Sequence, residues 1–272
     1  MSLTRGGGPL SGRPAGIANL DLGAHPGHAL YWEPYRRRIR GVVGGATLLD
    51  TERGMLLHET GLSPVLYVPE GDLRADLLVP TDHHTVCPFK GVASYRSISA
   101  GDRTLENAVW TYPDPLPGCP PISGHAAVYW DRLDHWYEED EELIGHLRDP
   151  YHRVDIRPSS RRVRVRWDGR VLAESSRARL LFETGLPARV YIPREDVDGA
   201  LLEPSDTVTV CAYKGTASHL SVRGAGDAGR DVAWAYAEPL VEAAQVGGYI
   251  AFYPEKADVE VAPPLAVGED AH

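Results

Sequence analysis

The chain of 272 residues carries one stretch of sequence twice, at an offset of 124 residues. The copies are Cys-Pro-Phe-Lys-Gly-Val-Ala-Ser at residues 87–94 and Cys-Ala-Tyr-Lys-Gly-Thr-Ala-Ser at residues 211–218. The same offset aligns residues 41–130 with residues 165–254, with 31 identities over 90 positions and no gap. Such a match indicates duplication of a whole domain, because its period far exceeds the roughly 20–50 residues of solenoid repeats. Each copy should therefore fold as a self-sufficient unit.

The duplication divides the chain into five predicted segments. We expect an irregular extension over residues 1–36, a first repeat domain over 37–137, an acidic helical linker over 138–160, a second repeat domain over 161–261 and a flexible tail over 262–272. Two small domains suit a chain of this length. The linker helix is predicted over residues 138–147, where Leu143, Ile144 and Leu147 would share one helical face.

Short β-strands separated by Gly and Pro turns are predicted within each repeat. Residues 65–68, 108–112 and 126–130 of the first repeat are rich in β-branched and aromatic side chains. In the second repeat, residues 162–167 alternate strictly and are followed by Asp168-Gly169, a hairpin signal. Short, regularly spaced strands with minor helix predict the all-β class, as two tandem small antiparallel β domains.

Composition argues against several classes of function. The net charge of -10 argues against a protein that binds a phosphate backbone, so no nucleic-acid partner is expected. No apolar run is long enough to span a membrane and the chain starts without a secretory signal, so we expect a cytoplasmic protein. Three cysteines are too few for a disulfide framework, which agrees with a reducing compartment.

No metal and no cofactor are expected from the motifs. Structural zinc requires Cys or His ligands at paired spacing, and the chain has no Cys-x-x-Cys. No Gly-rich phosphate loop is present. A Ser–His–acid triad is not predicted either, because Ser94 and Ser218 repeat but no histidine is expected to repeat with them. The histidines that the second copy replaces by Phe, Thr, Val and Tyr are His58, His83, His84 and His125.

Lys90 and Lys214 are the first candidates for catalysis, with Glu59 and Glu183 as their partners. Each lysine is read as part of an apolar strand, where burial would favour an uncharged amine that acts as a base or nucleophile. The alternative is an edge lysine whose ammonium stays in water. For the glutamates, the alternative is a local role at the turn made by the Thr-Gly that follows each of them.

Aromatic residues and small polar residues supply the candidates for ligand binding. Trp-x-Tyr recurs in both copies, and residues two apart lie on one face of a strand. Such a face can enclose a flat or cationic ligand, or it can be ordinary core packing. For the cysteines the favoured interpretation is an inert buried residue, which is the usual state of a free cysteine. The candidates are Tyr67, Trp110, Tyr112, Tyr191, Trp234, Tyr236, Cys87, Cys211, Ser94 and Ser218.

These motifs resemble those of a known family. The Cys-Pro-Phe-Lys-Gly and Cys-Ala-Tyr-Lys-Gly stretches, the two Glu-Thr-Gly-Leu stretches, Tyr-(Val/Ile)-Pro and Trp-x-Tyr-x-x-Pro are similar to domain of unknown function 427, in its tandem two-copy bacterial form. The resemblance covers nearly all of residues 37–261. It implies a small antiparallel fold resembling the β-tent group, whose other members often carry zinc, although this sequence lacks their cysteine pairs.

Three functional hypotheses stay open at this point. The first is an enzyme or sensor that binds an unknown small organic molecule in a pocket of each repeat, with Lys90 and Lys214 at its polar centre. The second is a non-catalytic binding module with an aromatic wall. The third is a structural or protein-interaction unit. An apolar groove with a lysine shifted towards its neutral form favours the first hypothesis. A cage without a buried ionisable group favours the second, and a flat surface with both lysines exposed favours the third.

Overall fold

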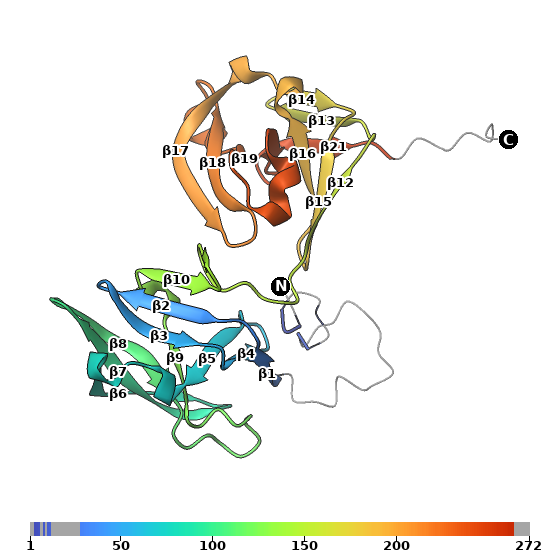
Figure 1. Ribbon diagram of the computed structural model, residues 1–272. Coiled ribbons are helices and arrows are strands. Elements are labelled where there is room, and N and C mark those ends of the chain that lie inside the picture. Colours follow the sequence, from blue (N-terminus) through green and yellow to red (C-terminus); the bar gives the residue numbers. More distant parts are fainter. Residues whose placement is uncertain (1–2, 6–7, 9, 12–27, 264–272) are drawn as a thin grey trace, which may run out of the picture. The chain divides into compact units, whose positions relative to one another are not determined.

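The computed structural model describes residues 3–5, 8, 10–11 and 28–263. The chain divides into two compact units between Tyr151 and His152, and each unit contains one repeat (Figure 1). Strands dominate both units, and within each unit every pair of neighbouring strands is antiparallel. This confirms the predicted all-β class with minor helix. None of the short helical turns within the described residues has the length and apolar character needed to cross a membrane.

Two antiparallel sheets make up the first unit (Figure 1). The larger has the order β1-β4-β5-β9-β8-β7-β6 and the smaller the order β11-β10-β2-β3. The strands are β1 Leu30–Tyr35, β2 Ile39–Val43, β3 Ala46–Thr51, β4 Gly54–Glu59, β5 Val65–Pro69, β6 Leu78–Cys87, β7 Gly91–Ala100, β8 Arg103–Thr111, β9 His125–Val128, β10 His135–Glu138 and β11 Glu141–Glu142. Single 3-10 turns are η1 Glu70–Asp72, η2 Ala75–Leu77 and η3 Trp130–Arg132.

The second unit repeats the larger sheet strand for strand, and its smaller sheet has counterparts of β2, β3 and β10. Its larger sheet has the order β12-β15-β16-β20-β19-β18-β17 and its smaller sheet the order β14-β13-β21. The strands are β12 Val154–Pro158, β13 Val163–Trp167, β14 Arg170–Ser175, β15 Arg179–Glu183, β16 Arg189–Pro193, β17 Leu202–Cys211, β18 Gly215–Val222, β19 Ala233–Tyr236, β20 Tyr249–Phe252 and β21 Asp258–Val261. The 3-10 turns are η4 Arg194–Asp196, η5 Gly199–Leu201, η6 Gly226–Gly229 and η7 Val241–Val246.

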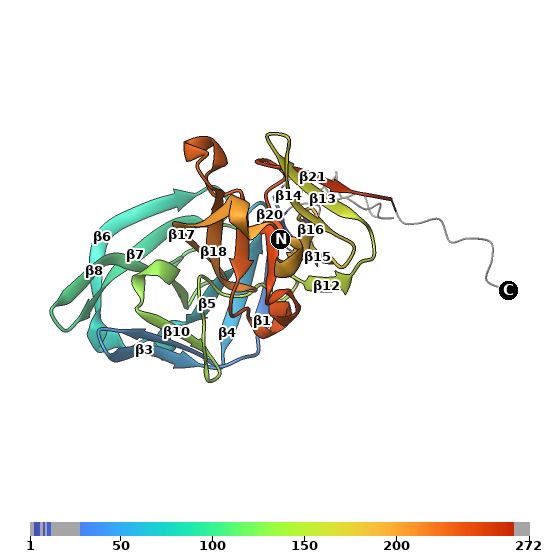
Figure 2. The same cartoon turned by 90° about the horizontal axis from the view of Figure 1, so that it is seen from above.

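The larger sheet of each unit presents a different set of side chains on each face. In the first unit one face packs with the smaller sheet around an apolar core that includes Leu48, Leu56 and Ile98. The register aligns Tyr67 with Trp110 across β9, so both rings lie on the opposite face. Figure 2 shows the long hairpin of β6 and β7 at one end of this sheet and its counterpart, β17 and β18, in the second unit. The candidate site lies on the aromatic face.

The helix predicted over residues 138–147 is absent, and that prediction was wrong. Residues 135–138 and 141–142 pair as a hairpin, and Glu139 adopts a left-handed backbone with φ 52°. Leu143 and Leu147 are buried in the core, where the Leu143 N–H donates to the carbonyl of Trp136 at 2.8 Å. Packing in the extended form therefore overrides a leucine spacing that also suits a helix.

The end of the predicted irregular extension is a regular strand. Residues 30–35 pair with β4 over six positions and form the edge of the larger sheet. In the second unit β12 takes the equivalent place. Residues 264–272 of the predicted tail lie outside the described residues, as do residues 12–27 of the predicted extension.

Candidate functional site

Each lysine lies in a hairpin turn and not within a strand, so that detail of the prediction was wrong. β6 ends at Cys87 and β7 begins at its register partner Gly91, which leaves Lys90 as the last residue of the turn. Lys214 has the same place between β17 and β18. The turn nevertheless buries both side chains, since Lys90 is 6% exposed and Lys214 is 8% exposed. The snorkelling alternative is therefore wrong.

The glycine after each lysine is required by the backbone of this turn. Gly91 has φ 106° and Gly215 has φ 104°, values that L side chains rarely adopt. A Cβ on Gly91 would lie 3.2 Å from the carbonyl oxygen of Asp114, and one on Gly215 would lie 3.3 Å from that of Glu238. The Lys-Gly pair thus lets the turn pass tightly under the following loop.

A carboxylate joins a lysine and a histidine in the first repeat. Lys90 Nζ donates to Oε2 of Glu59, the last residue of β4. His28 Nε2 lies 2.9 Å from Oε1 of the same carboxylate. The side chains of Lys90 and Glu59 are 8% and 9% exposed, and that of His28 is 19% exposed. We refer to these three side chains, and to their counterparts below, as the His–Glu–Lys network.

The second repeat contains the same His–Glu–Lys network. Lys214 Nζ donates to Oε2 of Glu183, the last residue of β15, and His152 Nε2 lies 3.0 Å from Oε1. The histidine side chain is 5% exposed here. In both repeats the histidine precedes the glutamate by 31 residues, and the glutamate precedes the lysine by 31 residues. The predicted pairing of lysine with glutamate is present in both copies.

Sequence reasoning missed the histidine. The expectation that no histidine repeats was wrong, because His28 and His152 are 124 residues apart. That expectation holds only within the aligned stretch that starts at residue 41. The signal was available, because Pro26 and Pro150 precede the two histidines by two residues at the same offset. Extending the ungapped alignment towards the start of the chain would have found the pair.

The carboxylate determines the direction of the hydrogen bonds in the network. An ionised carboxylate only accepts hydrogen bonds, so Nε2 of each histidine is the donor in this contact. Burial raises the pKa of Glu183, but donation by His152 and Lys214 outweighs burial and lowers that pKa to about 2. Glu183 is therefore ionised at neutral pH, and its carboxylate accepts the hydrogen bond from Lys214 Nζ.

The threonine of each Glu-Thr-Gly motif holds the backbone beside the histidine. Thr60 Oγ1 accepts the N–H of Ala29 at 2.8 Å, and Thr184 Oγ1 accepts the N–H of Arg153 at 2.8 Å. The residue that follows each histidine is therefore fixed to the turn that follows each glutamate. This double attachment explains why Glu and Thr recur together, with Glu binding the ring and Thr binding the chain.

An aromatic ring covers each histidine. Phe89 stacks on His28 with ring centroids 3.6 Å apart and an interplanar angle of 8°. Tyr213 packs on His152 with centroids 4.1 Å apart and an angle of 34°. Phe89 is 42% exposed, so it forms the solvent side of this contact. The residue before each lysine in the repeated motif is thus part of the histidine environment.

The predicted aromatic residues lie beside the network. Trp110 Nε1 donates to the hydroxyl of Tyr67 at 3.3 Å, and Lys90 Nζ is 6.0 Å from the centroid of the Tyr112 ring. Burial raises the pKa of Tyr67 and Tyr112 well above the ordinary value, so both phenols stay neutral. The same set in the second repeat is one buried cluster of Tyr191, Trp234 and Tyr236, with a 3.2 Å bond from Trp234 Nε1 to the Tyr191 hydroxyl.

The three cysteines are free thiols, with Cys87 and Cys211 at strand ends and Cys119 in the loop between β8 and β9. Cys87 and Cys119 pack against the cluster that contains Tyr112, and burial raises the pKa of the Cys119 thiol. Cys211 ends β17 in the same way as Cys87 ends β6. The thiols of the first repeat therefore belong to the aromatic face, and no thiolate chemistry is indicated by these surroundings.

The two predicted serines lie away from the network. Ser94 pairs with His84 in the register, and its Oγ is 3.4 Å from Nδ1 of that histidine. Its neighbours Ala93 and Tyr95 are buried on the aromatic face, so Ser94 is on the other face of β7. Ser218 has the equivalent exposed position on β18. The structure does not bring either serine to a lysine.

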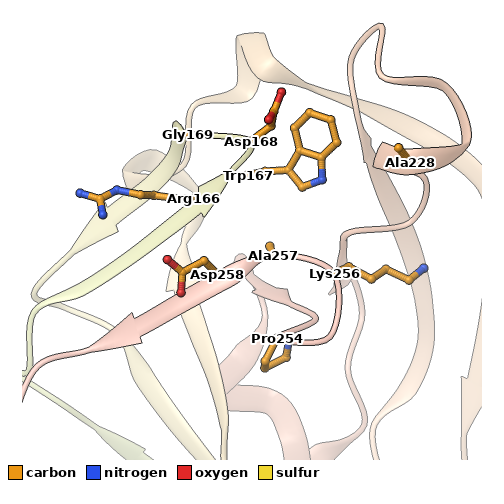
Figure 3. A pocket seen from close by; sticks show the side chains of 9 residues that line it. All are labelled: Arg166, Trp167, Asp168, Gly169, Ala228, Pro254, Lys256, Ala257 and Asp258. Atoms are coloured by element: carbon orange, nitrogen blue, oxygen red, sulfur yellow. The ribbon is translucent and has the colours of Figure 1, made fainter.

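Across residues 28–263 and the short described segments before them, no group of three or more His, Cys, Asp or Glu side chains is arranged to hold a metal ion. A cavity of about 920 Å³ lies beside the turn at residues 168–169 of the second repeat (Figure 3). Figure 3 shows Arg166 and Lys256 pointing away from each other, so these charged groups do not converge on a ligand.

Comparison with known proteins gives a family but no activity. No curated protein matches the chain. The model of a family described as a domain of unknown function, DUF427, matches residues 31–139 and residues 155–263. The two matches correspond to the two repeats. They include nearly all of β1 and β12, the strands that follow His28 and His152 in the sequence. The chain therefore belongs to the DUF427 family and contains two tandem copies of its domain.

Proposed function

We propose that each repeat binds a small organic molecule beside its His–Glu–Lys network and exchanges a proton with it through the histidine. The observation that supports this proposal is the repetition of the network. The same three residue types, at the same spacing and with the same atoms in contact, occur in two copies that share only 31 of 90 aligned residues.

Stability alone is a poor reason to keep this arrangement. Taking two charges out of water costs free energy that their attraction repays only in part, and well-packed apolar residues often serve a core as well or better. Each network nevertheless buries a lysine and a glutamate on the aromatic face. Buried ionisable groups with perturbed titration are typical of functional sites, which favours a role in binding or chemistry.

The geometry suggests a different task for each member of the network. The glutamate holds the histidine ring through Nε2, and imidazole is the side chain best suited to take up and release a proton near neutral pH. The lysine donates to the other carboxylate oxygen, and this contact keeps the glutamate ionised and in place. Because the lysine amine is engaged by the carboxylate, the histidine takes the acid–base role that the sequence favoured for the lysine. The neighbouring tyrosines and tryptophan offer an apolar wall.

A non-catalytic role is the second candidate, and one observation favours it. The network ties together the chain before β1, the end of β4 and the β6–β7 turn, and its lysines are 6% and 8% exposed. A contact of this kind can serve as a clamp between three segments. In that case the domain would act as a binding or interaction module, and the network would matter for folding alone.

Glutamine substitution of the histidines separates the two candidates. Glutamine keeps an N–H donor for the glutamate but has no basic nitrogen. The full chain and its His28→Gln/His152→Gln variant are purified, denatured and analysed by mass spectrometry for released small molecules. We expect a molecule that is retained by the wild type and absent from the variant, with little change in melting temperature. Equal small-molecule content in the two proteins would overturn the proposal.

A further inference from the structure

The two repeats differ by one charged residue beside a pair of packed aromatic rings. We call this pair the aromatic corner; it is Trp110 with Tyr129 in the first repeat and Trp234 with Tyr253 in the second. Arg189, the first residue of β16, occupies the position of Val65 in the first repeat. Its guanidinium carbon is 6.0 Å from the centroid of the Trp234 ring, and Nη2 donates to Oε1 of Glu255 at 3.2 Å. Tyr253 packs on the same tryptophan, with centroids 4.3 Å apart and an angle of 42°. The second repeat thus fills this corner with its own guanidinium.

The first repeat keeps the corner but has no arginine at its strand start. Trp110 and Tyr129 repeat the ring geometry, with centroids 4.5 Å apart and an angle of 42°. Asp131 occupies the position of Glu255, so the first repeat also has a carboxylate at the position that pairs with the arginine in the second. A cavity of about 300 Å³ lies here, lined by Val65, both rings and the further tryptophans Trp130 and Trp136.

We propose that this cavity of the first repeat binds the guanidinium group of a small molecule. The chain itself shows which chemistry the corner accepts, because the second repeat places a guanidinium at the equivalent tryptophan. A cation over the face of Trp or Tyr is attracted by the ring. Asp131 does not line the cavity, but its negative charge acts on Tyr129, one of the lining rings, and so favours a cation here. The volume falls at the lower end of small-molecule sites, which begin at about 300 Å³.

A second basic residue near the corner does not conflict with this assignment. Arg132 follows Asp131 in the sequence, and its charge acts on Tyr129. Arg132 and Tyr129 together line a different cavity. Its counterpart Lys256 has Nζ 5.4 Å from the centroid of the Tyr253 ring. The second repeat therefore accommodates Lys256 and Arg189 around one aromatic pair. The first repeat has Arg132 at the position of Lys256, and the place of the Arg189 guanidinium is left to a ligand.

The proposal is independent of the function proposed for the His–Glu–Lys network. Trp110 has contacts in both regions, because Nε1 donates to Tyr67 while the ring lines the cavity. The network residues His28, Glu59 and Lys90 do not line this cavity. A failure of one site to bind therefore leaves the other site untouched.

Propylguanidinium and its uncharged isostere propylurea are the probes for this site. Each is titrated into the full chain and followed by calorimetry and tryptophan fluorescence. We expect one saturable site for propylguanidinium and binding about tenfold weaker or more for propylurea, because only the cation gains the ring and carboxylate attraction. Asp131→Asn should weaken propylguanidinium binding and leave propylurea binding unchanged.

Exchange of the two strand-start residues gives the matched variants. Val65→Arg supplies the first repeat with the arginine of the second and should abolish propylguanidinium binding. Arg189→Val should create a second binding site, and it keeps the proposal testable if Val65→Arg fails to fold. Absence of propylguanidinium binding to the wild type, or equal binding of propylurea, would overturn the proposal. So would an arginine peptide that binds where propylguanidinium does not, because the cation would then come from a protein partner.

Discussion

His152 precedes Glu183 by 31 residues, and its Nε2 atom lies 3.0 Å from the carboxylate oxygen Oε1. The other oxygen of the same carboxylate accepts from Lys214, and both contacts recur in the first repeat. One buried carboxylate per repeat therefore connects the chain before the edge strand, the end of an inner strand and a hairpin turn.

Removal of one member of the ion pair should cost more than removal of both. Lys214→Met leaves the Glu183 charge buried with fewer donors, and we expect a loss of about 3–5 kcal/mol in the unfolding free energy of the second repeat. Glu183→Gln combined with Lys214→Met should recover part of this loss, because no uncompensated charge remains. Chemical denaturation of the wild type, both single variants and the double variant measures the coupling. A double variant with the full sum of both losses would contradict the account.

Acid should remove the contribution of Glu183 to stability. The pKa of this carboxyl is about 2 in the folded chain, below its ordinary value of 4.5. A depressed pKa contributes stability that is fully present above the ordinary value and is lost as the pH falls towards about 2. The contribution amounts to about 3 kcal/mol. The difference in unfolding free energy between the wild type and Glu183→Gln should therefore shrink from pH 7 to pH 2.5, and a constant difference would refute the assignment.

The turn after the lysine should not tolerate a side chain. Gly215→Ala must place a Cβ at φ 104° and 3.3 Å from a carbonyl oxygen, for which we expect a cost of about 1–3 kcal/mol. Gly199→Ala in the same repeat is the control, because a Cβ there meets no atom within 4 Å and the backbone is ordinary. Thermal unfolding of both variants measures the difference. Equal effects of the two substitutions would show that the turn is not constrained.

Purified protein should contain no stoichiometric zinc or iron. The chain has no Cys-x-x-Cys, and the part of it that the structure describes has no cluster of three or more suitable ligands. Elemental analysis of protein purified without chelators measures the metal content directly. One zinc ion per repeat would contradict this prediction and would change the chemistry assigned to the histidines.

Most of the fold could be predicted from the sequence, because the duplication and the alternating strands are local signals. The segment at residues 138–147 could not, since its leucine spacing suits a helix and only burial of Leu143 and Leu147 in the core decides for an extended chain. The same limit applies to residues 30–35, whose pairing partners in β4 lie 19 to 29 residues away in the sequence.

The candidate site was predicted in part. Lys and Glu recur in conspicuous motifs, and their opposite charges made the pairing predictable. The histidines stand outside these motifs, and only the three-dimensional structure shows that they meet the glutamates. Ser94 recurs as clearly as the lysine, yet the two-residue period of β7 puts it on the other face of the sheet. Repetition identifies the residues that both copies share, but it does not show which of them are in contact in the folded chain.

Titration of four proteins with the molecule that the wild type releases tests the central claim most directly. The four are the wild type, His28→Gln, His152→Gln and the double variant, and calorimetry gives the number of sites in each. Because the repeats are separate units, the account predicts two sites in the wild type, one in each single variant and none in the double variant, with additive effects. Unchanged binding to the double variant would contradict the assignment of binding and proton exchange to the His–Glu–Lys network.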